Sequence, residues 1–208
     1  MMSTELLASQ MGAGKYSKPI EDACIRWGFV EGRDKARFIA QLYVESDGFR
    51  HVAENLNYSA KRLVQVFGGR NGLTPARAEI LAGIGPKAVA NFIYGGEWGR
   101  KNLGNTQPND GWDFRGRGLI MLTGRANYQR MSLEAYGNDR LLVDPDELLM
   151  PEVAADTAAC FWHRQRLNGV TDVAVVTKKI NGGQMGLAER IAQTNRAYNL
   201  LIRMTEGR

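Results

Sequence analysis

The sequence predicts a mainly α-helical protein with many sharp turns. The long stretches between glycines are rich in Ala, Leu, Arg and Glu, which are good helix formers, while glycine is abundant at 24 residues and proline scarce at 6. The chain has 208 residues, 44% of them hydrophobic, which is enough for one well-buried core or for one core with a smaller lobe beside it. No internal repeat and no Pro/Ser linker marks a second independently folding module.

In the first half of the chain, apolar periodicity and capping residues predict a series of helices. Ser59 is a favourable N-cap, and Thr74 is a cap followed by proline at the first helical position. Gly28 is expected to end one helix, and Asp47-Gly48 to end another. The expected helices span 3–11, 17–28, 33–46, a segment after Ser59 that contains Leu63, Val66 and Phe67, 75 to about 82, and 86 to about 95.

The stretch GGEWGRKNLGNTQPNDGWDFRGRG, which ends at Gly118, differs from what precedes it. It carries glycines, asparagines and a Pro-Asn-Asp-Gly turn signal but almost no periodicity, so it is predicted to be a long structured loop. Trp98, Trp112 and Phe114 are expected to be buried and argue against disorder. The apolar run 119–122 that follows could form a small strand or the first turn of a helix.

The second half is predicted to contain four more helices. They are expected at 125–136, 151–167, 171–180 and 187–203. The last of them is expected to bury one stripe made of Leu187, Ile191, Thr194, Tyr198 and Leu201.

The net charge of +5 and the pI of about 9.3 predict polyanionic surroundings, such as nucleic acid, anionic lipid or a bacterial envelope. Cys24 and Cys160 are far apart and lack CxxC spacing, so two buried free thiols are expected. His51 and His163 have no second histidine at i+4, and no P-loop or nucleophile elbow is present. The sequence therefore predicts no metal site and no cofactor.

The N-terminus lacks a basic start followed by an apolar run, and no apolar run approaches about 18 residues. We therefore expect synthesis as a soluble cytoplasmic protein without stable membrane insertion. The single RGRG stretch at 115–118 resembles an RNA-binding repeat superficially, but among apolar residues it favours a tight structural loop.

Glu45 is a candidate general acid, because it shares a helix face with Leu42 and Phe38. Desolvation on an apolar face favours the protonated carboxyl, which is the form that a general acid needs. The alternative is that Glu45 merely ends its helix and bends out to water.

Glu54 follows nine residues later, beyond the break at Asp47-Gly48. A chain reversal at the break would let the two carboxylates face each other, and about 6.5–9.5 Å between them would suit an inverting glycosidase that places a water between base and sugar. A pair alone is weak support, because 22 acidic residues yield many such spacings.

Thr123 is a third candidate, because its hydroxyl could hold the attacking water. The alternative is an ordinary N-cap for the helix that begins near Arg125. Polar or aromatic side chains near other predicted helix ends are suited to sugar hydroxyls. They are Asn127, Tyr128, Asn181 and Arg190.

Several stretches share the order and spacing of a known enzyme family. They are Glu45-Ser46 before Gly48-Phe49, ENLNYS at 54–59, GWDFRGRGLIMLTG at 111–124, Asn127-Tyr128, and INGG at 180–183. In this combination, from about residue 20 to 202, the chain resembles the glycoside hydrolase family 19 (chitinase-like) domain in the compact form that phage endolysins use.

The resemblance implies a lysozyme-like, two-lobed helical fold with a substrate cleft. It implies a single catalytic domain over 1–208 without a separate wall-binding domain, with a large lobe of about 1–59 and 106–208 and a small lobe of about 60–105. In such a cleft, aromatic side chains such as Trp112 stack on apolar sugar faces.

Carried over by position, the resemblance implies that Glu45 is the general acid, that Glu54 is the general base, and that Thr123 helps hold the water. The positions that bind the sugar or tie the acidic pair in place correspond to Asn127, Asn181 and Arg190.

Three residues depart from the family pattern. Val44 stands where histidine is usual, Met121 where glutamine is usual, and Asp47 where glycine is common. The first two replacements remove polar groups beside the acid, so Glu45 is expected in a more apolar pocket.

The function that the resemblance implies is that of an endolysin, a cofactor-free and monomeric muramidase. Its partner would be the glycan strands of peptidoglycan, not nucleic acid, and it would wait in the host cytoplasm until a holin lets it reach the wall in the periplasm. A chitinase and a lytic transglycosylase are the alternatives among enzymes. From a different class, the chain could be an inactive wall-binding or nucleic-acid-binding protein.

Overall fold

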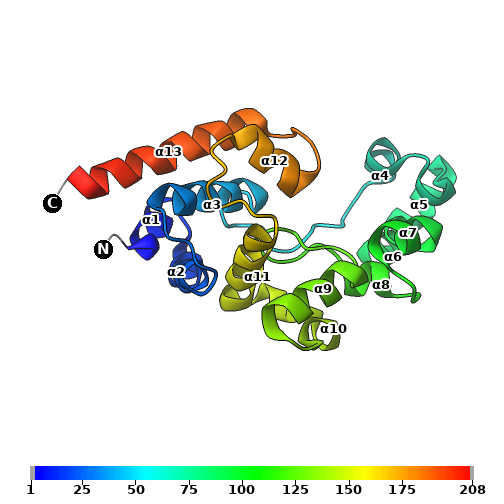
Figure 1. Ribbon diagram of the computed structural model, residues 1–208. Coiled ribbons are helices and arrows are strands. Elements are labelled where there is room, and N and C mark those ends of the chain that lie inside the picture. The colour runs from blue at the N-terminus through cyan, green and yellow to red at the C-terminus, as the bar shows by residue number, and fades with distance from the viewer. Residues whose placement is uncertain (1–2, 207–208) are drawn as a thin grey trace. The chain divides into compact units, whose positions relative to one another are not determined.

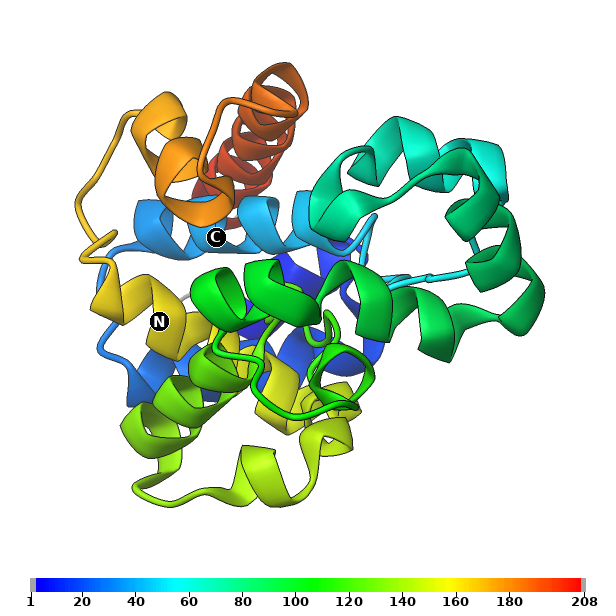
Figure 2. The same ribbon diagram turned by 90° about the vertical axis from the view of Figure 1, so that its right-hand side faces the viewer.

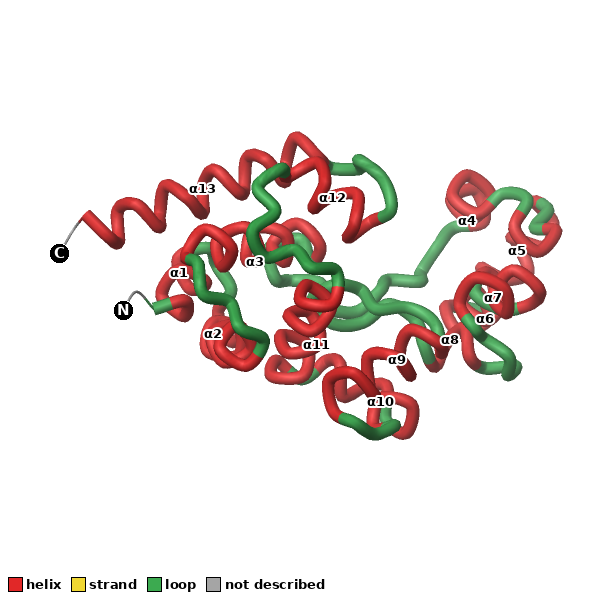
Figure 3. Tube along the Cα trace, viewed as in Figure 1, coloured by secondary structure: helices red, strands yellow, loops and turns green. Residues whose placement is uncertain are grey.

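The computed structural model describes residues 3–206 and confirms the mainly α-helical class. Within this range the chain forms thirteen α-helices and three short 3-10 helices, and its only β-type pairings are isolated bridges. Figure 3 shows the helices joined by loops, without a sheet. None of the helices in 3–206 is long and apolar enough to cross a membrane.

The chain divides into two compact units. The first comprises 1–52, 118–120 and 147–208, and the second comprises 53–117 and 121–146. The segment 60–105, expected as a small lobe, falls wholly within the second unit, which also takes in 106–117 and 121–146.

The first unit is built around α3 (Gly32–Glu45). The long C-terminal helix α13 (Leu187–Glu206) packs along α3, as Figures 1 and 2 show, and α2 (Ser17–Arg26) packs on both α1 (Thr4–Gln10) and α11 (Pro151–Arg164). The remaining helices of this unit are η1 (Gly14–Tyr16) and α12 (Val173–Asn181), and η3 (Pro145–Leu149) begins in the second unit and ends in the first.

An aromatic cluster fixes the centre of the first unit. Phe29, Phe38 and Trp162 are almost fully buried, with ring centroids 5.0–6.1 Å apart. Such contacts add to the free energy of burial of the rings. Cys24 and Cys160 are buried too and form no disulfide, and burial raises the pKa of the Cys24 thiol to about 12.

The second unit has its own apolar core under α4 (Ala60–Phe67), α5 (Pro75–Ile84) and α6 (Pro86–Ile93). Leu63, Val89 and Ile93 are buried there. The rest of the unit comprises η2 (Arg70–Gly72), α7 (Gly96–Leu103), α8 (Asp110–Asp113), α9 (Arg125–Tyr136) and α10 (Arg140–Val143).

Three predictions about local structure were wrong. The stretch expected as a loop contains α7 and α8, which lack an apolar stripe and are held by contacts with other elements. The run 119–122 forms neither strand nor helix, but turns back so that Leu122 bridges Arg117. On α13, Ile191 is 42% exposed, whereas Arg190 and Ala197 are buried.

Candidate active site

Glu45 is the last residue of α3, and its carboxylate is held from α13. The Nη2 atom of Arg190 donates to Glu45 Oε1, and Nη1 of the same guanidinium donates to Gln41 Oε1 at 2.6 Å. The side chain of Arg190 is 5% exposed and that of Glu45 is 16% exposed. Glu45 therefore does not bend out to water, because a buried cation fixes it.

The turn after α3 explains why the helix ends at this carboxylate. Ser46 is fully buried, and its hydroxyl donates to the Leu42 carbonyl at 2.6 Å and accepts from the Phe49 N–H at 3.0 Å. Asp47 and Gly48 adopt left-handed backbone conformations with φ of 49° and 69°. The predicted break at Asp47-Gly48 is thus confirmed, and residues with φ near these values cannot continue a right-handed helix.

Val44 and Arg190 both lie close to Gly186. A Cβ atom placed at Gly186, where φ is +70°, would lie 3.9 Å from Arg190 Nε and 4.0 Å from Val44 Cγ1. The valine that stands where histidine is usual therefore presents a methyl group, rather than an imidazole, to Gly186.

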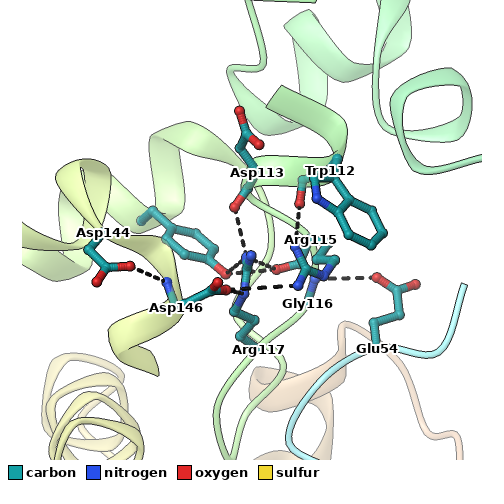
Figure 4. Close-up of polar contacts among 9 residues, drawn as sticks. Glu54, Trp112, Asp113, Arg115, Gly116, Arg117, Asp144 and Asp146 are labelled. Atoms are coloured by element: carbon teal, nitrogen blue, oxygen red, sulfur yellow. Dashed lines mark hydrogen bonds and ion pairs between the residues drawn. The ribbon is translucent and has the colours of Figure 1, made fainter. Parts of the chain in front are cut away.

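Glu54 lies in the extended segment before α4, in the second unit, and pairs with Gly116 through two hydrogen bonds, of which Figure 4 shows the one to the carboxylate. Its backbone N–H donates to the Gly116 carbonyl at 2.9 Å, and its Oε2 accepts from the Gly116 N–H at 3.3 Å. The hydroxyl of Tyr94 donates to Oε1. The carboxylate is thus fixed by one backbone amide and one phenol, both of them neutral donors.

The surroundings of Glu54 keep the Tyr94 hydroxyl protonated. Burial, and then the charge of Glu54, raise the pKa of Tyr94 well above its usual range. A phenol in this state donates a hydrogen bond to a carboxylate. The Arg70 guanidinium carbon lies 3.7 Å from the centroid of the Trp98 ring, and its positive charge acts on Glu54 and Tyr94.

The side chains of Thr123 and Glu54 both approach the Cβ position of Gly116. A Cβ atom placed at Gly116 would lie 3.3 Å from Thr123 Oγ1, 3.3 Å from Glu54 Cβ and 3.4 Å from Glu54 Oε2. The Thr123 hydroxyl donates to the Met121 carbonyl at 2.9 Å, and Asn127 Nδ2 donates to the Thr123 carbonyl at 2.7 Å. Thr123 is not an N-cap, because Gly124 takes that position for α9.

Two other predicted binding residues, Asn181 and Trp112, belong to different units. Asn181 is exposed in the first unit, where its amide donates to the Met185 carbonyl at 3.0 Å and closes the INGG turn. In the second unit Trp112 is half-buried with the Arg115 guanidinium 4.0 Å from its ring centroid.

Tyr128 is fully buried, which changes what it can do. Its hydroxyl donates to the Arg115 carbonyl at 2.7 Å and accepts from Arg117 Nη1 at 3.0 Å. Burial raises the pKa of Tyr128 to about 12. Tyr128 therefore has no surface for a sugar, and any effect on binding is exerted through these two arginines.

Sequence reasoning did not identify Gln41 or Tyr94. Gln41 could have been found, because it lies one helical turn before Glu45 on the same face. Tyr94 has no local signal, since its partner is 40 residues away in the sequence. Within 3–206 no group of three or more His, Cys, Asp or Glu side chains could hold a metal ion.

The structure thus gives a helical protein with two anchored glutamates, and comparison with known proteins gives its class. No family model matches the chain. A protein of Haemophilus influenzae named glycosyl hydrolase family 19 domain-containing protein is 36% identical over 166 residues, which cover 78% of this chain and 78% of that protein. The chain therefore belongs to glycoside hydrolase family 19.

Proposed function

We propose that this glycoside hydrolase is an endolysin that cleaves the β-1,4 bond between N-acetylmuramic acid and N-acetylglucosamine. In this reaction Glu45 protonates the glycosidic oxygen, and Glu54 removes a proton from the water that attacks the anomeric carbon. Water adds across the bond in a single displacement, so the configuration at that carbon inverts. The reaction uses no cofactor.

The arrangement around Glu54 carries the proposal. A general base must be fixed while its carboxylate accepts a proton, and the Gly116 amide and the Tyr94 hydroxyl fix Glu54 by both oxygens. Thr123 Oγ1 and the Glu54 carboxylate approach the same side of Gly116, so a water bound there could hydrogen-bond to both groups.

The biological setting belongs to the same proposal. The enzyme is made in the host cytoplasm and reaches the peptidoglycan in the periplasm when a holin opens the membrane. The net charge of +5 supports attraction to an anionic wall. Lysis of the cell follows from cutting the glycan strands, and we propose that the enzyme acts as a monomer.

Glu45→Gln and Glu54→Gln test the proposal. General acid or base catalysis contributes roughly 10²–10⁴-fold, so each variant should hydrolyse purified peptidoglycan slower by about that factor. Both variants keep the shape of the side chain, and thermal unfolding checks that they remain folded. Wild-type rates in both would overturn the assignment of the two glutamates.

The rival activities predict different substrates and products. A chitinase would cleave N-acetylglucosamine oligomers at least as fast as peptidoglycan. A lytic transglycosylase needs only one glutamate, so it would keep its activity in one of the two variants. An inactive wall-binding protein would bind permeabilised cells without lysing them.

A further inference from the structure

A pocket of about 470 Å³ opens in the second unit, and neither Glu54 nor Thr123 lines it. One part of its wall carries three guanidinium groups, of Arg115, Arg117 and Arg125, and two carboxylates, of Asp113 and Asp146. Another part is apolar, with Leu142, Val143 and Pro145. A pocket that combines guanidinium groups with an apolar wall suits a small ligand that has an anionic group and a hydrocarbon part.

The guanidinium groups are fixed in advance. Arg115 lies over the Trp112 ring and donates to the Trp112 carbonyl at 3.0 Å. Arg117 is almost fully buried and donates to the Asp113 carbonyl at 2.7 Å (Figure 4). It also donates to the Tyr128 hydroxyl at 3.0 Å. Because these side chains are already ordered, an incoming anion would not have to offset their conformational entropy.

The positive charge of Arg115 and Arg117 is weakly compensated. Asp146 Oδ1 lies 2.7 Å from Arg117 Nε but 3.8 Å from Arg115 Nη2, and its side chain is 62% exposed. Burial, and then the charge of Arg117, lower the pKa of Arg115. Arg125 differs, since buried Asp110 accepts from it at 2.6 and 2.8 Å. Ion pairs with an exposed carboxylate are weak, so another carboxylate could compete with Asp146 for Arg115.

We propose that this pocket binds a carboxylate of the peptide stem that peptidoglycan carries and chitin lacks, with Arg115 as the binding residue. The inference rests on the proposed function and deepens it by naming what selects the substrate. The apolar wall matches the methyl groups of the alanines of such a stem and of the lactyl group that joins the stem to the sugar. Arg115 directly precedes Gly116, whose N–H donates to Glu54, so the stem would be held next to the segment that fixes the base.

The first experiment measures binding without catalysis. Calorimetry would compare a soluble muramyl tetrapeptide with the same compound after amidation of its carboxyl groups. Wild type should bind the free acid about tenfold more tightly, as expected for a charge-assisted hydrogen bond, and Arg115→Gln should remove this difference. Asp146→Asn should increase affinity for the free acid, because it removes the competing carboxylate. Arg130→Gln, which changes an exposed arginine outside the pocket, is the control for net charge.

The second experiment separates this inference from the proposed function. Peptidoglycan is digested before and after an amidase has removed its stems, and the lactyl carboxylate that the amidase leaves on the sugar is converted to a methylamide. Faster cleavage of stem-bearing strands, lost in Arg115→Gln, supports the inference. Equal cleavage of both by wild type overturns it while the muramidase assignment stands. If wild type cleaves neither kind of strand, the muramidase assignment fails, and the calorimetry alone decides whether the pocket binds a carboxylate. In the calorimetry, the inference is overturned if wild type, Arg115→Gln and Asp146→Asn all bind the free and the amidated tetrapeptide with equal affinity. Asp146→Asn is included because a gain in affinity cannot result from misfolding, whereas a loss in Arg115→Gln could.

Discussion

Glu45 and Glu54 are held in opposite ways. Glu45, in the first unit, is paired with a buried guanidinium whose other arm bonds Gln41. Glu54, in the second unit, is held by a backbone N–H and a phenol, both without charge. The first arrangement depends on one side chain that mutation can remove, whereas half of the second belongs to the main chain. The comparison predicts that the first site is the more fragile of the two.

The largest effect is expected for Arg190→Leu. Arg190 and Glu45 are mostly buried, and removing one partner of a buried pair costs about 3–5 kcal/mol, because it leaves an uncompensated charge. Urea unfolding should show this loss. Arg190→Lys, which keeps the charge but cannot bond both partners as a planar fork, should lose less stability. A loss of less than about 1 kcal/mol of unfolding free energy in Arg190→Leu would contradict the comparison, because the buried ion pair would then contribute no more than a neutral hydrogen bond.

Tyr94→Phe should have a smaller effect at the other site. It removes one neutral donor from Glu54 while the Gly116 amide remains, so about 1 kcal/mol of stability should be lost. Hydrolysis of peptidoglycan should fall about tenfold in kcat with little change in KM, because an ill-positioned base slows the chemical step. Tyr58→Phe is the matched control, because Tyr58 lies in the field of Glu54 without donating to it in the described part of the chain. An equal loss in both variants would count against a positioning role for Tyr94.

The pH dependence of stability, compared between wild type and Tyr94→Phe, is a second test of the site around Glu54. The pKa of Tyr94 is raised above its unfolded value near 10, so its contribution to stability is fully present below about pH 10. Above that pH the unfolded chain releases the proton and the folded chain keeps it. Wild type should therefore lose about 1.4 kcal/mol more per pH unit than Tyr94→Phe does.

Unfolding free energies measured from pH 9 to 11 test this expectation. Other buried groups that titrate there, such as Tyr128, are common to both proteins and cancel in the difference. Parallel curves for the two proteins would show that Tyr94 is not kept protonated by the fold.

Local capping signals were enough to predict many helices. The Ser59 and Thr74 hydroxyls accept from the Arg62 and Arg77 N–H groups at 3.3 and 3.2 Å, each within the first turn of its helix. Such bonds depend on neighbouring residues alone, so the sequence contains the whole signal. The helix predicted at 125–136 has the same bounds in the structure.

Helix α7 was missed because its support is not local. Asn71 Oδ1 accepts from the Trp98 N–H at 3.4 Å, and Arg70 stacks over the Trp98 ring. The residues of α7 show no apolar stripe that would predict a helix. Tertiary contacts of this kind commonly override local preference.

The partners of the two glutamates escape sequence reasoning for the same reason. Arg190 is 145 residues from Glu45, and Gly116 is 62 residues from Glu54. From its position alone Arg190 was predicted to contact sugar hydroxyls, and only the resemblance to a family implied a link to the acidic pair, whereas nothing local pointed to the Gly116 amide. The candidate acids could be found from their positions, whereas the groups that fix them required the folded chain.

The most direct test of the central claim is the identity of the ends that the enzyme produces. Purified peptidoglycan is digested, the new ends are identified by mass spectrometry, and the anomer formed first is identified by proton NMR. An inverting muramidase predicts reducing N-acetylmuramic acid ends that appear first as the α-anomer. Anhydro ends, reducing N-acetylglucosamine ends or initial formation of the β-anomer would contradict the account.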